Sequence, residues 1–143
     1  MFSKDMVRNY YYFIAGILAI LFSITHAWNG QSVVLPSLDT DAITADTKTI
    51  FFYVWHIITA ENMIFGIAFF YMSFYKDLSK VRFAAWIIAI LMIVRWVVIF
   101  GGTLLYNASS LKSTLTDSIA IVVYVVLIIA GTHVKDRKTE SKL

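Results

Sequence analysis

Four long apolar runs decide what this chain can fold into. They cover residues 12–28, 50–75, 83–106 and 117–134. At about 1.5 Å per helical residue, each run is long enough to cross most or all of the roughly 30 Å hydrocarbon core of a bilayer. The chain is 59% hydrophobic and only 15% charged. We therefore predict an all-α integral membrane protein, a single four-helix transmembrane bundle over residues 1–143 with up-down-up-down topology.

The first run has a second interpretation as a signal peptide. It follows a basic start, and Thr25-His26-Ala27 is a possible cleavage site. We interpret residues 12–28 as the first membrane helix.

The distribution of Lys and Arg predicts the orientation. Nine of these residues lie in the N-terminal segment, in the short link around residues 76–82 and in the tail 135–143, whereas the two other loops hold one each, Lys48 and Lys112. Basic residues accumulate on the cytoplasmic side of membrane proteins. We expect a multi-pass protein of the plasma (inner) membrane, of bacterial type, with both termini in the cytoplasm (N-in/C-in). The net charge of +3 is thus a topology signal, and we expect no nucleic-acid partner.

The connections between the runs differ in length. Residues 29–49 are expected to form a long outer loop, whose second half could extend the next helix. Thr114 and Asp117 have the spacing of a capping box, which would start the fourth helix there. The charged residues 135–143 are expected to form a cytoplasmic tail.

Two charged residues are expected near the membrane midplane. Glu61 lies about 15 residues before Lys76, and Arg95 about 13 residues after Arg82, so their depths match within roughly one helical turn. A lone charge at the bilayer centre costs about 2.5–3.5 kcal/mol. We predict a Glu61–Arg95 ion pair, near Tyr124, which either locks the helices together or lines a ligand or ion pathway.

A second polar layer is predicted nearer the outer surface. His26, His56 and Asp117 are all expected in the outer third of the bundle, although His26 also suits an interfacial position and Asp117 also suits a helix cap. On the first helix, small and polar side chains recur at helical spacing and should face another helix. The members of this stripe are Ala15, Ala19, Ser23 and His26. On the second helix, we expect an inward face of Tyr53, Ile57, Ala60, Ile64, Ala68 and Tyr71.

No catalytic signature is present, and we expect a protein that is not an enzyme. His56 and Glu61 are five residues apart, which misses the spacing of a zinc-binding helix. His26, His56 and Asp117 could still bind a divalent metal, and the two histidines could hold haem b.

The absence of cysteine excludes disulfides and thiol chemistry, and with them the quinone-linked disulfide-forming membrane proteins. In size and helix number the chain is similar to the vitamin K reductase-like, DoxX-like and sterol isomerase-like proteins. The first group needs cysteines, and the motifs of the sterol isomerase-like group are not matched residue by residue. We assign the chain to none of these families.

The leading hypothesis is that an outward-open polar pocket binds or passes a small solute, an ion, a proton or a lipid-like ligand. Its predicted lining is Glu61, Arg95, His56, His26, Tyr53, Asp117 and Tyr124. Two alternatives stay open, namely a haem or metal redox component using His26 and His56, and a structural or accessory membrane subunit. Besides membrane lipids, a homo-oligomer or a partner membrane subunit is expected, with contacts through Asn62, Gly66, Gly101 and Gly102.

Overall fold

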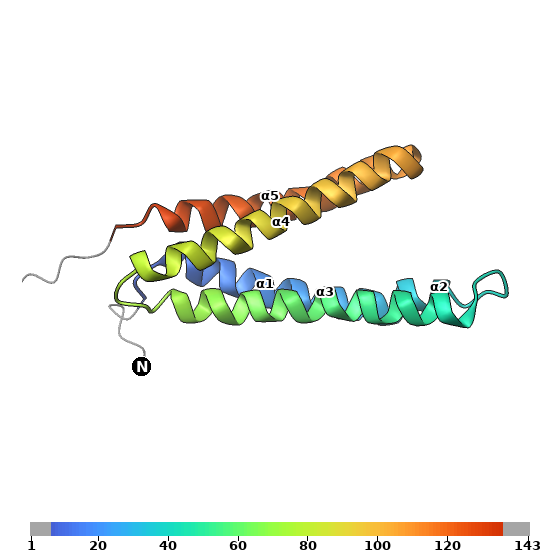
Figure 1. Cartoon of the computed structure of the whole chain (residues 1–143), viewed down its shortest axis with the longest axis horizontal. Coiled ribbons are helices and arrows are strands. Elements are labelled where there is room, and N and C mark those ends of the chain that lie inside the picture. Colours follow the sequence, from blue (N-terminus) through green and yellow to red (C-terminus); the bar gives the residue numbers. More distant parts are fainter. Residues whose placement is uncertain (1–6, 136–143) are drawn as a thin grey trace, which may run out of the picture. The chain divides into compact units, whose positions relative to one another are not determined.

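A computed structural model describes residues 7–135 of the chain, and all regular structure within this range is helical (Figure 1). Four stretches are long and apolar enough to cross a membrane. The first is α1 (Tyr10–Asn29), continued by a π-helical segment (Gly30–Val34) and by α2 (Leu35–Ser37). The others are α3 (Ala45–Met72), α4 (Ser79–Tyr106) and α5 (Leu111–Thr132), which a short 3-10 turn (Ala108–Ser110) precedes. The prediction of an all-α protein with four membrane-length helices is confirmed, and residues 1–6 and most of the predicted tail, 136–143, lie outside the described range.

The predicted outer loop 29–49 is too long in its first half, because the first helical stretch extends into it, whereas the expected extension of the next helix into its second half is confirmed. The first helical stretch continues to Ser37 and α3 begins at Ala45, so the connection is short. Thr44 caps α3, since the backbone N–H of Thr47 donates to the Thr44 hydroxyl oxygen at 3.3 Å. Asp46 lies in the first turn, where a negative charge suits the helix dipole.

The predicted capping box at Thr114 and Asp117 is wrong. α5 begins at Leu111, so both residues lie inside the helix. The Thr114 hydroxyl lies 3.2 Å from the Ser110 carbonyl oxygen and 3.2 Å from the Thr103 hydroxyl of α4. Thr114 therefore ties the two helices together near the turn, and it does not cap the helix start.

The described residues form two compact units. Unit 1 contains residues 7–15 and 69–135, and unit 2 contains residues 16–68. In unit 1, α4 and α5 form an antiparallel hairpin, which Figure 1 shows as two neighbouring helices. At the end opposite the turn, the Arg82 guanidinium donates from Nη2 to the Val134 carbonyl oxygen at 2.8 Å. The buried side chains of α4 in this hairpin are all apolar, namely Ala85, Ile88, Ala89 and Met92.

The start of α1 is anchored in unit 1 by one asparagine. Asn9 is buried, its Nδ2 donates to the Gly131 carbonyl oxygen at 2.8 Å, and its Oδ1 accepts from the Tyr12 backbone N–H at 3.2 Å. The fully buried Tyr12 ring lies against Gly131, where a Cβ atom would overlap it, and 5.3 Å from the Phe69 ring. Asn9 thus caps α1 and at the same time binds the end of α5.

In unit 2, α1 and α3 meet through small and polar residues. Ala19 and Ser23 are buried, and the Ser23 hydroxyl donates to the Thr59 carbonyl oxygen at 2.8 Å. A Cβ atom at Gly66 would lie 3.0 Å from the Gly16 carbonyl oxygen, so the two backbones approach closely there. These contacts confirm that the small-residue stripe of the first helix is a contact face.

Within unit 2, α3 contacts α1 through Thr59 and Gly66, neither of which belongs to the inward face predicted for the second helix. Tyr53, Ile57 and Ile64 are 48%, 52% and 62% exposed, whereas Asn62 is 9% exposed and Gly66 is buried. Within unit 2, α3 thus turns toward α1 a different side from the predicted one. Of the residues expected to contact a second copy of the chain, Gly101 and Gly102 have open space where a Cβ atom would lie, with nothing within 4 Å.

Candidate functional site

A close approach between a glycine and a tryptophan organises the loop end of unit 2. Gly30 is buried against the Trp55 indole, and a Cβ atom at Gly30 would overlap that ring. The Trp55 Nε1–H donates to the His26 carbonyl oxygen at 2.9 Å. Gly30 also opens the π-helical segment, in which the Leu35 N–H reaches the Gly30 carbonyl oxygen five residues back. Single π-helical turns of this kind are rare and occur frequently at functional sites.

Trp55 also holds the first of the predicted histidines. The His26 imidazole stacks on the indole with ring centroids 4.2 Å apart and an angle of 4° between the planes. One tryptophan therefore contacts both the side chain and the backbone carbonyl of His26. This double contact fixes the histidine against α3.

The second predicted histidine lies beside the same segment. The Gln31 side-chain amide donates to His56 Nε2 at 2.8 Å, which corresponds to the tautomer with its proton on Nδ1. The Phe52 ring lies edge-on to the His56 ring at 4.6 Å. An iron or another metal at His56 Nε2 would have to displace the Gln31 amide.

A groove of about 560 Å³ lies at the loop end of unit 2. It is mostly apolar, with one ion pair at its edge, and we name it the Lys48 groove. Its lining residues come from the end of the first helical stretch, from the turn after it and from the start of α3. They are Leu35, Pro36, Leu38, Asp39, Lys48, Thr49 and Phe52.

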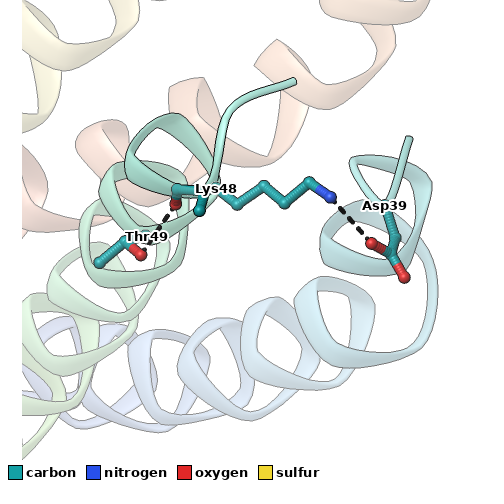
Figure 2. Close-up of polar contacts among 4 residues, drawn as sticks. Asp39, Lys48 and Thr49 are labelled. Carbon is teal, nitrogen blue, oxygen red and sulfur yellow. Dashed lines mark hydrogen bonds and ion pairs between the residues drawn. The ribbon is translucent and has the colours of Figure 1, made fainter. Parts of the chain in front are cut away.

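Figure 2 shows the polar residues of the Lys48 groove. The Lys48 Nζ donates to Asp39 Oδ1 at 2.9 Å, and the Thr49 hydroxyl donates back to the Ala45 carbonyl oxygen at 3.0 Å. The hydrogen bond from Lys48, together with its positive charge, holds the pKa of the Asp39 carboxyl below its ordinary value. The ion pair connects the turn after α2 to the first turns of α3, so it spans the two sides of the groove.

The sequence-predicted site residues fall in both units. His26, Tyr53, His56 and Glu61 belong to unit 2, whereas Arg95, Asp117 and Tyr124 belong to unit 1. The structure brings His26 and His56 to the same Trp55–Gln31 region of unit 2.

Tyr53 and Asp117 are exposed, and Tyr124 is buried in unit 1, close enough to Arg95 for the two to interact electrostatically. The Glu61–Arg95 pair stays a prediction. The same holds for metal or haem binding. Within residues 7–135 there is no group of three or more His, Asp or Glu side chains arranged to hold a metal ion.

Sequence reasoning missed the residues that build the groove and its neighbourhood. The sequence pattern places Lys48 in a loop and indicates no role for Trp55, Phe52 or Gln31. One signal was present, because Asn29, Gly30 and Gln31 follow directly on the first apolar run and end it with polar or flexible residues. The pairing of Asp39 with Lys48 depends on a turn whose length the sequence did not reveal.

The four apolar helices define a small multi-pass membrane protein. Neither a family model, nor a curated protein, nor a solved structure matches the chain.

Proposed function

We propose that this membrane protein binds a lipid-like molecule in the Lys48 groove, at the outer surface of the membrane. The proposal narrows the pocket hypothesis of the sequence to one place and one kind of ligand. The observation that carries it is the lining of the groove, in which four apolar side chains, Leu35, Pro36, Leu38 and Phe52, accompany a single ion pair. A volume of a few hundred Å³ is typical of small-molecule sites.

The position of the groove favours a ligand that already resides in the membrane. The groove lies at the end of two helical stretches that are long and apolar enough to cross the bilayer, Tyr10–Ser37 and Ala45–Met72. A molecule with an apolar body and a polar head group reaches this depth by partitioning into the leaflet. The nine Lys and Arg residues of the N-terminal segment, the 76–82 link and the tail support an orientation in which both termini face the cytoplasm and the groove faces outward.

Photoaffinity labelling tests the binding proposal. Long-chain probes with a diazirine at the chain end, one a fatty acid and one the corresponding alcohol, are added to the protein in lipid nanodiscs, and cross-linked peptides are mapped by mass spectrometry. We expect saturable labelling within residues 35–52 by at least one probe. Absence of saturable labelling there by both probes would refute the proposal.

A matched pair of substitutions locates the site. Phe52 lines the groove and is 51% exposed, while its neighbour Phe51 is 48% exposed and does not line it. Phe52→Ala should weaken binding about fivefold, since it removes roughly 1 kcal/mol of apolar contact from a half-exposed ring. Phe51→Ala should leave the affinity unchanged.

The orientation is tested with single cysteines, because the chain contains none of its own. Asp41→Cys in the loop should react with an impermeant maleimide added outside intact cells. Lys80→Cys, in the first turn of α4, should react only after the membrane is opened. The reverse pattern would show that the groove faces the cytoplasm.

A further inference from the structure

We infer that the ligand of the Lys48 groove is an anionic amphiphile, whose head group replaces the Asp39 carboxylate at Lys48 Nζ. This inference rests on the proposed function and specifies the class of ligand for the same groove. The shared chemistry of the class is a long apolar chain with one negatively charged oxygen-bearing group, such as a carboxylate.

The two members of the ion pair are exposed to very different extents. The Lys48 side chain is 34% exposed, whereas the Asp39 side chain is 85% exposed. Water therefore already solvates most of the Asp39 carboxylate, and its release from Lys48 requires little change in its surroundings. The Lys48 ammonium, in contrast, is held on α3 beside the apolar lining, where an incoming anion can meet it.

The lining suits the remainder of such a molecule. Lysine side chains commonly lay an apolar stem along a hydrophobic surface and keep the ammonium at the edge. Lys48 lines the groove together with the apolar Phe52 and Leu35. A chain lying on these apolar side chains would place its head group next to Nζ. Charge-assisted hydrogen bonds from an ammonium to a carboxylate are among the stronger polar contacts in proteins.

A cationic amphiphile fits this arrangement less well. Among residues 7–135, Lys48 is the only basic residue that lines the groove, and the acidic residue that would attract a cation, Asp39, is largely in water. A cation that bound Asp39 would lie next to the Lys48 ammonium, which already donates to Asp39 Oδ1, and would be repelled by its positive charge. An anion leaves the more exposed partner free, which is the smaller disturbance.

Competition experiments test the inference. The photoactivatable fatty acid is bound to the full-length protein in nanodiscs, and three unlabelled competitors of equal chain length are compared, namely the fatty acid, the alcohol and the amine. We expect the fatty acid to compete at a concentration about tenfold lower than the alcohol, with the amine weakest, as expected for one charge-assisted hydrogen bond. If the alcohol or the amine competes as well as the acid, the inference is wrong although the groove still binds lipid-like molecules.

Three substitutions at the ion pair complete the test. Lys48→Met keeps the apolar stem and should reduce the affinity for the fatty acid about tenfold without affecting the alcohol, whereas Lys48→Arg should preserve the preference. Asp39→Asn removes the competing carboxylate and should raise the affinity for the fatty acid several-fold. A Lys48→Met protein that keeps the acid preference, or an Asp39→Asn protein with no gain, would overturn the inference.

Discussion

The contact between Gly30 and Trp55 allows a sharp prediction about stability. Gly30→Ala introduces a Cβ atom into the space that the Trp55 indole occupies. The ring must then move, which costs about 1–3 kcal/mol for an overpacked contact. Its movement also weakens the hydrogen bond from Trp55 Nε1 to the His26 carbonyl oxygen, worth about 0.5–1.5 kcal/mol.

A compensating gain comes from helix propensity. Inside a helix, alanine is more favourable than glycine by about 1 kcal/mol of folding free energy, and part of this stabilisation applies to Gly30→Ala. The net expectation is a loss of about 2 kcal/mol in the free energy of unfolding, with the larger steric cost deciding the sign. The measurement is equilibrium unfolding in mixed micelles with a rising fraction of SDS, together with near-UV circular dichroism of the tryptophan environment.

A second glycine provides the matched control. Gly101 also lies inside a helix, but a Cβ atom there would meet nothing within 4 Å. Gly101→Ala should therefore leave stability unchanged or raise it slightly. If Gly30→Ala is as stable as Gly101→Ala, the indole does not occupy the position described here. A Trp55→Ala background should abolish most of the Gly30→Ala cost, since the two changes are then coupled through one contact.

Two further predictions concern charged residues. In Lys48→Met, the pKa of the Asp39 carboxyl should rise toward its ordinary value of 3.8. NMR titration of the side-chain carboxyl carbon measures this pKa. In the native chain the ion pair is fully formed at a pH above that ordinary value and is lost as the pH falls through the lowered pKa. An Asp39 pKa that is the same in the native chain and in Lys48→Met would contradict the pairing. For the Glu61–Arg95 pair predicted from the sequence, Glu61→Gln or Arg95→Leu alone should destabilise the protein by about 2.5–3.5 kcal/mol, the cost of a lone charge at the bilayer centre. The double variant should recover most of this loss in SDS unfolding, and additive losses would disprove the pair.

The helical architecture could be predicted because it depends on local composition. Each of the four apolar runs satisfies its backbone hydrogen bonds internally, as a segment in lipid must, so their number and approximate position follow from hydropathy alone. The contact stripe of the first helix was also predictable, since Ala19 and Ser23 are small enough for close packing and recur at helical spacing.

The ends of the helices were less predictable because they depend on specific partners. The first helical stretch continues through Gly30 because the glycine leaves room for Trp55, which lies 25 residues further along the chain. α5 begins at Leu111 and not in the predicted Thr114 region, since the connection from α4 consists only of Asn107 and a short 3-10 turn, Ala108–Ser110. Neither the contact between Gly30 and Trp55 nor the 3-10 turn before α5 can be recognised in the hydrophobic pattern of the sequence.

The sequence by itself determined that this chain forms four apolar helices of membrane length and concentrates its basic residues in three segments. Only the tertiary structure decided which side of α3 is buried, that His26 stacks on Trp55, and that Lys48 and Asp39 meet beside an apolar groove. The physical reason is that side chains facing lipid are as apolar as side chains facing another helix. Hydropathy therefore identifies a membrane helix but does not show which of its sides faces a neighbouring helix. That rotation about the helix axis is set by packing contacts between residues that are distant in the sequence.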